Sequence, residues 1–354
     1  MWKDKKVLVT GGVSFIGSYL TDSLLKRGAV VRVADNLSSG KLHNLHYNFR
    51  NERQGVWVSD NLTIFAGDLK DKSFTSNMVK GVSVVFHLAN LHGGRGYIQM
   101  HPVECCSNMI LDQLLFEEAY KAGVERVCFA SSACVYPTYT AEEKTSSYRL
   151  KEEDADPFIR DKAFPDLEYG WAKLMGEMAL KAYNRQHGMK TSSVRIHNVY
   201  GPRENETHAM TALIAKTFVR MDPYEIWGNG KQSRNFTYVQ DIVDAMMLAA
   251  EKITDGSAIN AGREDEITIN ETAELIFDIL NWRPRKIKYD LSKPVGATSR
   301  AADLTKARKL LGWEPKVSYK QGIEKTIEWY VANRKKEDVS AGMETLLMER
   351  AGLR

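Results

Sequence analysis

The chain has 354 residues, 43% of them hydrophobic and 27% charged, which excludes the disordered and fibrous classes and predicts one large domain with a smaller companion. Its 49 basic and 45 acidic residues are scattered and give a net charge of +4, which does not favour nucleic acid as a partner. No apolar run approaches the roughly 20 residues of a membrane helix. No signal peptide precedes the first strand, and the four cysteines lack the spacing of a zinc site, so we expect a cytoplasmic protein without a metal or a membrane partner.

Strand-like apolar runs alternate with amphipathic helical stretches through the first half of the chain. This alternation predicts an α/β protein whose parallel sheet is covered by helices on both faces. The predicted strands are Lys6–Thr10, Val30–Asp35, Leu62–Asp68, Val82–Ala89, Arg126–Ser132 and Thr191–Tyr200, and the main helices are Ile16–Arg27, Val103–Ala122 and Glu168–His187.

The regular alternation ends after Gly201-Pro202. We expect residues 1–200 to form the larger domain, with 236–262 returning to it, and residues 201–235 and 263–340 to form a smaller, mixed α/β domain. Residues 341–354 give only a weak helical signal and are expected to be a tail, and the polar stretch Thr138–Asp156 is expected to be a surface insertion. The elements predicted here are Met210–Val219, Tyr224–Trp227 (a strand), Val239–Lys252, Asn270–Leu280, Leu304–Leu311 and Gln321–Asn333.

The stretch VTGGVSFIGSYL, residues 9–20, places a glycine-rich turn between the first strand and the first helix. Backbone N–H groups at a helix N-terminus can bind a pyrophosphate, and Gly11, Gly12 and Gly17 leave room for it. Ser14 stands where the usual Gly-x-x-Gly-x-x-Gly pattern has its middle glycine. Its side chain therefore either points away or donates to the phosphate, and a plain strand–helix turn is the alternative.

The second strand favours a dinucleotide. It ends at Asp35, 18 residues after Gly17, where a carboxylate can accept hydrogen bonds from both ribose hydroxyls and repel a 2′-phosphate, which favours NAD over NADP. Asp68 ends the third strand and either meets the adenine or caps a helix. Leu88 and Ala89 leave space for the cofactor after the fourth strand.

Tyr169 and Lys173 form a Tyr-x-x-x-Lys pattern on one face of a predicted helix. A phenol with a pKa near about 10 is a poor base at neutral pH, but a neighbouring ammonium and a cationic nicotinamide ring can lower that pKa. Ser132 ends a predicted strand and can hydrogen-bond the same substrate oxygen. Cys134 lies two residues further on, and it is either a proton carrier or a small buried filler.

These motifs, together with ADNLSSG, SSACVYP and RIHNVYGPRE, resemble the extended short-chain dehydrogenase/reductase family from about Lys6 to Asn333. The resemblance implies a Rossmann doubly wound sheet that holds NAD and a smaller C-terminal domain that holds a nucleoside-diphosphate sugar. It also implies a homodimer formed through Val103–Ala122 and Glu168–His187. The predicted NAD-binding residues are Gly11, Ser14, Phe15, Ile16, Gly17, Asp35, Asn36, Asp68, Leu69, Leu88, Ala89, Tyr169 and Lys173.

Within this family, LHGGRGYI, residues 91–98, and SSACVYP are similar to segments of the GDP-mannose 3,5-epimerases. The resemblance implies an NAD-dependent nucleotide-sugar epimerase that acts through a transient 4-keto sugar. Tyr169 would be the base for the C4 hydroxyl, Lys173 and Ser132 would support it, and Cys134 would exchange protons at C3 or C5. His208 stands where that group has a second base, a lysine. Substrate contacts are implied for Gly93, Gly94, Asn198, Arg234 and Arg300.

Three alternatives stay open. Arg95 stands where these epimerases have an apolar residue, and because an arginine suits a carboxylate, a UDP-glucuronate 4-epimerase or decarboxylase competes. A UDP-glucose 4-epimerase needs only Tyr169, and Cys134 would be dispensable in it. His208 and Arg95 can equally be incidental loop residues. Ala133-Cys134 replaces the acidic pair of a 4,6-dehydratase, and an intact Ser132, Tyr169 and Lys173 set argues against a non-catalytic NAD-binding scaffold.

Overall fold

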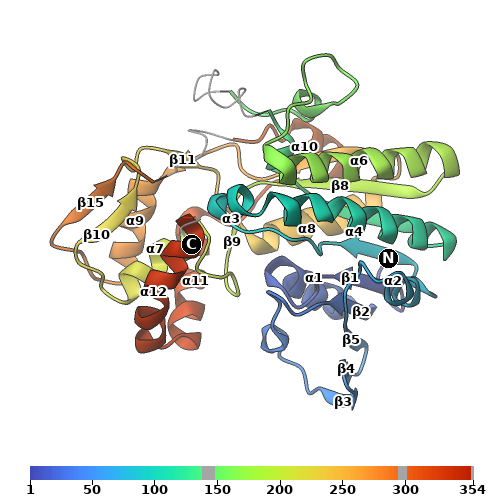
Figure 1. Cartoon of the computed structure of the whole chain (residues 1–354), viewed down its shortest axis with the longest axis horizontal. Helices are drawn as coiled ribbons and strands as arrows, with labels where there is room; N and C mark the ends of the chain where they lie inside the picture. Colours follow the sequence, from blue (N-terminus) through green and yellow to red (C-terminus); the bar gives the residue numbers. More distant parts are fainter. Residues whose placement is uncertain (138–147, 294–300, 352–354) are drawn as a thin grey trace.

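The computed structural model describes residues 1–137, 148–293 and 301–351 of the chain. Within these ranges a nine-stranded sheet forms the centre of the protein (Figure 1). The strands from β13 to β5 are parallel, whereas β4 and β3 extend one edge in antiparallel pairing. In spatial order they are β13 (Ala258–Ala261), β8 (Lys190–Ile196), β7 (Arg126–Ser132), β6 (Val84–His87), β1 (Lys6–Thr10), β2 (Val30–Asp35), β5 (Leu62–Ala66), β4 (Val56–Ser59) and β3 (Arg50–Arg53).

Helices cover both faces of this sheet. One face carries α1 (Phe15–Lys26), α8 (Val239–Lys252) and α10 (Thr305–Leu311), and the other carries α2 (Lys72–Val79), α4 (Pro102–Lys121) and α6 (Leu167–His187). Val7 and Val9 belong to the first apolar core and Leu8 to the second, because successive side chains of a strand point to opposite faces. This is the Rossmann doubly wound arrangement, so the predicted fold class is confirmed. Among the helices described, none is both long enough and apolar enough to cross a bilayer.

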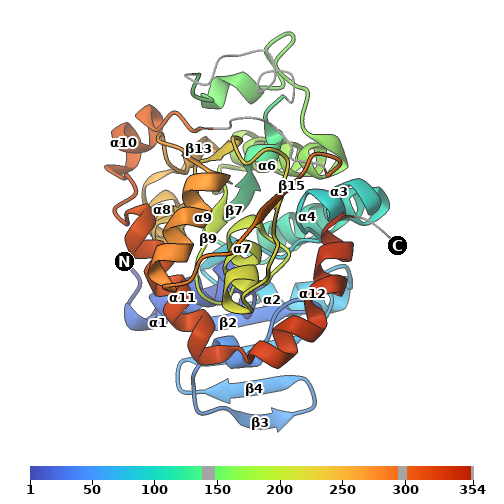
Figure 2. The ribbon, with the colours of Figure 1, turned by 90° about the vertical axis from the view of Figure 1, so that its left-hand side faces the viewer.

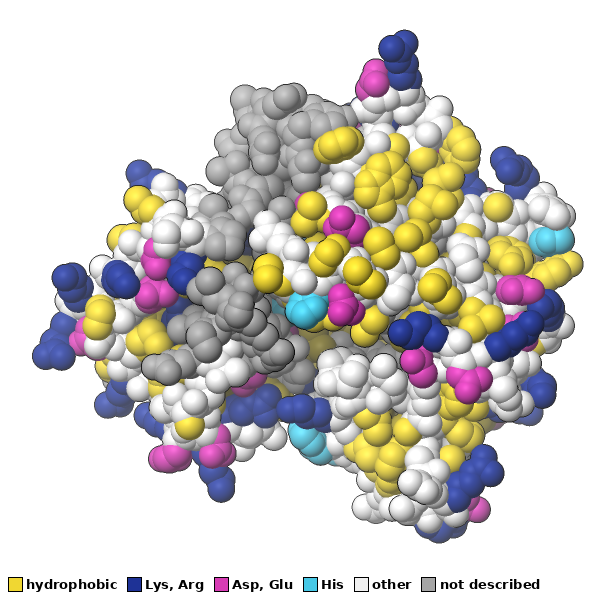
Figure 3. Space-filling model, viewed as in Figure 1, with side chains coloured by type: hydrophobic (Ala, Val, Ile, Leu, Met, Phe, Trp, Pro, Cys, Tyr) yellow, Lys and Arg dark blue, Asp and Glu magenta, His cyan; other side chains and the backbone are white. Residues whose placement is uncertain are grey.

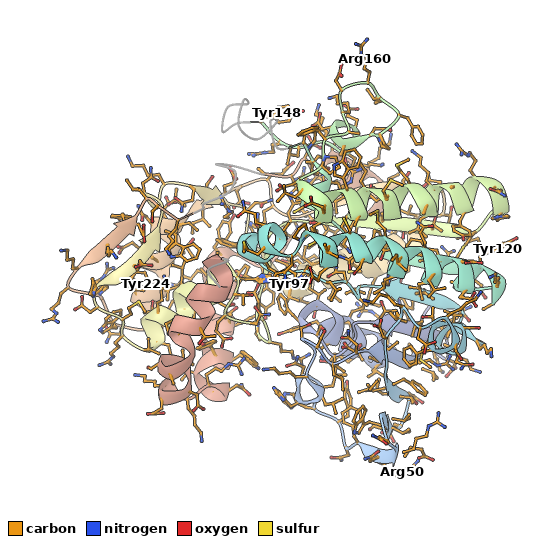
Figure 4. All side chains as sticks on the ribbon, viewed as in Figure 1. Arg50, Tyr97, Tyr120, Tyr148, Arg160 and Tyr224 are labelled. Carbon is orange, nitrogen blue, oxygen red and sulfur yellow. The ribbon has the colours of Figure 1, made fainter. Side chains whose placement is uncertain are left out.

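A further apolar core lies in what we call the small lobe, which faces the viewer in Figure 2. Its strands β10 and β15 pair in parallel, and Tyr224 of β10 (Figure 4) packs edge-on against Phe277 of α9. The elements of the small lobe are α7 (Ala209–Phe218), β10 (Tyr224–Trp227), α9 (Ile269–Ile279), β15 (Ile287–Asp290), α11 (Tyr319–Asn333) and α12 (Lys336–Ala351).

Short elements join the sheet to the small lobe. The expected strand Thr191–Tyr200 is divided, since its last two residues leave β8 and pair with β12 instead. α3 (Arg95–Met100) packs against α12. The remaining elements are β9 (Val199–Tyr200), β11 (Ser233–Arg234), β12 (Thr237–Tyr238), β14 (Ile267–Thr268), η1 (Leu42–Asn44), η2 (Ala133–Val135) and η3 (Glu152–Ala155).

Three segments differ from expectation. The β3–β4 hairpin was not predicted, because Arg50–Arg53 is polar and exposed throughout and lacks the alternation of a half-buried strand. The supposed tail lies largely in α12, where Val339 and Met343 are buried in the small-lobe core. The described part of the supposed surface insertion buries Leu150 and Ala155 against η2 and α6.

A buried ion pair fixes α6 to the sheet. Arg195 of β8 donates to the Glu177 carboxylate of α6 from both Nη2, at 2.8 Å, and Nε, at 3.0 Å. Their side chains are only 4% and 8% exposed. Ser131 donates to the same carboxylate. Because both charges are out of water, each depends on the other to offset its lost hydration.

We expect Glu177→Gln to lower the free energy of unfolding by about 3–5 kcal/mol, because it leaves the Arg195 charge buried without a counter-ion. Urea unfolding followed by circular dichroism measures this. Glu117→Gln on the exposed side of α4 is the matched control, and it should leave the midpoint unchanged. Equal midpoints for the two variants would show that the pair contributes nothing.

Candidate active site

A cavity of about 540 Å³ lies where the strand ends of the sheet meet the small lobe. Its walls come from the loops after β1, β2, β5, β6 and β7, from the start of α6, and from the segment between β9 and α7. Ligands of doubly wound sheets bind at such carboxyl ends of parallel strands. The cavity is therefore the candidate active site.

The glycine-rich turn forms one wall of this cavity. Gly11 has a φ of +67°, which favours glycine, and its carbonyl oxygen lies so close to α1 that a Cβ on Gly17 would be 2.1 Å from it. Residues with side chains would push α1 away from the turn. The backbone at the N-terminus of α1 is thus accessible to a pyrophosphate, and the turn fits a dinucleotide.

Ser14 lines the cavity beside Asp35. Its hydroxyl lies 3.5 Å from Oδ2 of Asp35, which also accepts from the backbone N–H of Val13 at 3.2 Å. Oδ1 of Asp35 accepts from Leu37 N–H at 2.9 Å. Burial raises the pKa of Asp35, and these hydrogen bonds oppose the rise. Ser14 therefore orients the carboxylate that was predicted to bind the ribose.

Asp68 also lines the cavity, and the alternative that it caps a helix is wrong. Asp71 caps α2 instead, accepting from Ser73 and Phe74 N–H groups. Oδ1 of Asp68 accepts from Lys70 N–H at 2.8 Å, in the turn before that helix. The other predicted NAD-binding residues on this wall are Phe15, Ile16, Asn36, Leu69, Leu88 and Ala89.

Beneath this wall a buried hydrogen-bond chain runs from β1 to α4. Thr10 Oγ1 accepts from the N–H groups of Leu88 and Ala89, both at 3.0 Å, so its own proton goes to Nδ1 of His87 at 2.8 Å. The ring proton of His87 is then on Nε2, which donates to Oδ1 of Asp112 at 2.8 Å. Burial lowers the pKa of His87, in agreement with a neutral ring.

Oδ2 of Asp112 has no hydrogen-bond partner among the described residues, although it is buried. It faces α6, since a Cβ on Gly176 would lie 3.1 Å from it. The Asp112 charge raises the pKa of Lys173, whereas burial, the larger effect, lowers that pKa to about 8. Asp112 thus helps to keep Lys173 cationic.

The predicted catalytic residues meet where α6 begins. Tyr169 lines the cavity and its hydroxyl is hydrogen-bonded to Ser132 at the end of β7. Lys173 lies one turn further along and is 1% exposed. Its Nζ donates to the carbonyl of Ala130 at 2.9 Å and lies 5.8 Å from the centre of the Tyr169 ring. Lys173 therefore supports Tyr169 from below the cavity surface.

The chain's own residues do not lower the pKa of Tyr169, contrary to the expectation from its neighbouring ammonium. Burial raises that pKa, the Cys134 thiol adds to the rise, and only the hydrogen bond from Ser132 opposes these two effects among the main causes. The Lys173 ammonium is turned toward the Ala130 carbonyl. The nicotinamide cation, the second expected contribution, belongs to the cofactor.

Two further predicted residues belong to the same cavity as Tyr169. Cys134 lies in η2, is half-buried and packs in an apolar cluster with Tyr169 and Cys105. His208 is the N-cap of α7, and its Nδ1 lies 3.5 Å from Oε1 of Glu204. Both Cys134 and His208 line the cavity. The positions of Cys134 and His208 do not test the chemical roles predicted for them.

The predicted substrate contacts are partly brought together. Gly93, Gly94, Asn198 and Arg234 line the cavity, and Asn198 donates to the Asn235 side chain at 2.7 Å. A Cβ on Gly94 would be 3.0 Å from the Thr207 carbonyl, so glycine lets the two segments approach. Arg95 is the first residue of α3. Arg300 lies outside the described residues.

The sequence analysis did not predict several of the residues that line the cavity. They share no motif, because each reaches the cavity from a segment whose side-chain direction only the fold determines. His92, just before the two glycines, carried the clearest signal, since it belongs to a stretch already singled out. The others include Asp166, Arg203, Glu204, Lys216, Gln232 and Arg334.

We expect the ammonium of Lys173 to be lost as the pH rises through about 8, and Asp112→Asn to move that loss to lower pH, because it removes a stabilising negative charge but keeps an acceptor for His87. NMR titration of protein labelled at lysine Cε, assigned with Lys173→Met, measures this. An unchanged midpoint in Asp112→Asn would contradict the coupling.

Comparisons with known proteins agree with this geometry. Residues 7–262 match the model of the NAD dependent epimerase/dehydratase family. GDP-mannose 3,5-epimerase of Arabidopsis thaliana is 30% identical over 338 residues, covering 94% of this chain and 84% of that protein. UDP-N-acetyl-alpha-D-glucosaminuronate decarboxylase of Bacillus cytotoxicus is 31% identical over 335 residues, covering 92% and 98%. The solved structure of UDP-glucose 4-epimerase with UDP-glucose from Thermotoga maritima has a TM-score of 0.79 at 29% identity, covering 92% of this chain and 99% of that one. The chain therefore belongs to the NAD-dependent epimerase/dehydratase family, and its cofactor is NAD.

Proposed function

We propose that the protein is an NAD-dependent nucleotide-sugar epimerase that acts through a transient 4-keto sugar, with a reaction of the GDP-mannose 3,5-epimerase type. The observation that carries this proposal is the place of Cys134, a thiol on the cavity wall in the same cluster as Tyr169. A reaction confined to C4 has no need of such a group. The 30% identity to GDP-mannose 3,5-epimerase over 94% of the chain supports the same choice.

NAD, when bound, supplies a hydride acceptor at C4 that can return the hydride later. The chain would hold its pyrophosphate at the turn after β1 and its ribose at Asp35. Tyr169 takes the proton of the C4 hydroxyl, Ser132 orients that oxygen, and Lys173, whose Nζ lies 5.8 Å from the centre of the Tyr169 ring, supports Tyr169. The ketone acidifies the hydrogens at C3 and C5, and Cys134 exchanges a proton there. The sequence predicted His208 as the second acid/base.

Two other reactions remain candidates because relatives perform them. The decarboxylase relative is 31% identical, and a structure of similar fold contains UDP-glucose. C4 inversion of UDP-glucose, or reaction of a glucuronic acid nucleotide, would use Tyr169 in the same way. Only the need for Cys134 separates them from the proposed reaction.

The predicted cytoplasmic location rests on the low cysteine usage, which suits a reducing compartment.

We expect deuterium to enter C3 or C5 of GDP-mannose when the protein with bound NAD is incubated in D2O, as followed by proton NMR. UDP-glucose and UDP-glucuronic acid are incubated separately. Cys134→Ala should lower the exchange by about 10²–10⁴-fold, the usual contribution of a general acid or base. Tyr169→Phe should abolish all turnover, because the ketone does not form.

Cys106→Ala, at a thiol on α4 away from the cavity lining, is the matched control and should exchange like the unchanged protein. Inversion of a UDP-sugar at C4 without solvent exchange, and unaffected by Cys134→Ala, would replace the proposal with a C4-only epimerase. Loss of carbon dioxide from UDP-glucuronic acid would replace it with a decarboxylase.

We also propose a homodimer formed by α4 and α6. These helices pack side by side at the surface, and apolar side chains gather over them in Figure 3. Val103 and Ile110 of α4 are 76% and 63% exposed, and Trp171 and Met175 of α6 extend the patch. A second copy related by a two-fold axis would cover each patch with the other and form a four-helix contact.

We expect Ile110→Lys to convert the dimer into a monomer, because a buried, unpaired ammonium would face the apolar patch. Sedimentation velocity measures the mass. Val331→Lys, at an exposed apolar residue of α11, is the control and should remain dimeric. A monomer for the unchanged protein would contradict the proposed assembly.

A further inference from the structure

His92 is one of the cavity residues that the sequence motifs did not assign. It follows β6 and precedes the two glycines of the loop, and its side chain is exposed to the cavity. Its ring meets the Tyr169 ring edge-on, with 6.2 Å between the ring centres, and lies 6.0 Å from the His208 ring. His92 is thus between the predicted C4 base and the predicted second base.

The two histidines differ in their surroundings. His208 faces the buried carboxylate of Glu204, with Nδ1 and Oε1 3.5 Å apart. The ring nitrogens of His92, in contrast, receive no hydrogen bond from any residue in the described ranges. A neutral ring with an unused nitrogen that faces a cavity can accept a proton from a bound ligand.

Loss of water around the ring lowers the pKa of His92, and nearby positive charge adds to this effect. The groups that face it are His208 at the start of α7 and, from α6, Tyr169 and the Lys173 ammonium. The cavity walls shield the ring from part of the solvent, which lowers the pKa of His92, and the positive charges of His208 and Lys173 lower it further. His208 therefore lowers the pKa of the neighbouring His92 ring, and His92 is the residue whose neutral ring nitrogen can accept a proton.

We propose that His92, rather than His208, is the catalytic residue that removes the proton from the sugar carbon beside C4, and that the Glu204–His208 pair is a positioning pair that keeps His92 unprotonated. This inference rests on the proposed epimerase function and names the base of that same site. The ligand is the sugar ring of a nucleoside diphosphate sugar, in its 4-keto form.

The step balances without another reactant. The C–H bond at C3 or C5 breaks, its proton goes to the neutral His92 nitrogen, and its electron pair becomes the enolate of the C4 ketone. The Cys134 S–H bond then breaks, its proton goes to the opposite face of that carbon, and the ketone forms again. The resulting imidazolium returns its proton to the thiolate through solvent, so nothing is consumed.

The test compares His92→Asn, His208→Gln and His187→Asn in the protein with bound NAD. His187 ends α6, about 30 Å along the helix from its start, and serves as the control. We expect His92→Asn to lower deuterium exchange at the carbon beside C4 by about 10²–10⁴-fold while reduced nicotinamide still forms on adding the sugar nucleotide. As the pH falls, His208→Gln should lose the exchange at a higher pH than the unchanged protein does, because removing a cation raises the pKa of His92.

Exchange by His92→Asn as fast as by His187→Asn would overturn the inference and leave the proposed function intact. The absence of exchange in the unchanged protein with every sugar nucleotide would instead overturn the proposed function. Imidazole NMR then decides the inference by itself, with His92 assigned from the His92→Asn spectrum. A ring that stays neutral from about pH 8 to pH 5 and shifts on adding GDP-mannose or UDP-glucose supports it, whereas ordinary titration near about 6.5, or no shift, contradicts it.

Discussion

The helix that carries Tyr169 can approach the end of β7 only because residue 170 is glycine. A Cβ there would lie 2.2 Å from the carbonyl oxygen of Cys134, and the same carbonyl accepts from Asp166 N–H at 2.8 Å, one turn before. This contact places Tyr169 against Ser132 and brings Lys173 over the Ala130 carbonyl. The rest of the candidate site is arranged around the position that this contact gives to α6.

Below the cavity, buried charges are held in compensating sets. Arg195 faces Glu177, and Asp112 is shared between a hydrogen bond to His87 and the nearby ammonium of Lys173. The first set joins β8 to α6, and the second joins α4 to β6 and to α6. The layers of the fold are thereby fixed relative to one another by groups that cannot be exposed or neutralised singly without cost. The same buried charges therefore determine the electrostatics of the site and stabilise the packing of the helices on the sheet.

The sequence predicted the sheet and the cofactor loop because both depend on local patterns. Apolar runs mark the strands, and the spacing from Gly17 to Asp35 is set by one strand–helix–strand unit. The sequence could not predict that the Ser14 hydroxyl contacts the Asp35 carboxylate, because that contact depends on how closely two loops approach each other. His92 was missed for a similar reason, since its neighbours Tyr169 and His208 come from distant parts of the chain. The effect of burial on Tyr169 also needed the packed environment, because a motif shows a charged neighbour but not how much water is lost.

The contact between α3 and α12 has a mechanical consequence. The small lobe is joined to the sheet by the chain segments around β9 and β12, and α12 adds a further link from the end of α11 to the helix that follows the loop of His92. Tyr97 of α3 lies at this junction in Figure 4. A hinge motion that widened the cavity would have to part α12 from α3 as well as bend the connecting segments. Such a double attachment favours confinement of the sugar between binding and release. The proposed reaction requires this confinement, because the hydride taken from one sugar molecule has to return to that same molecule.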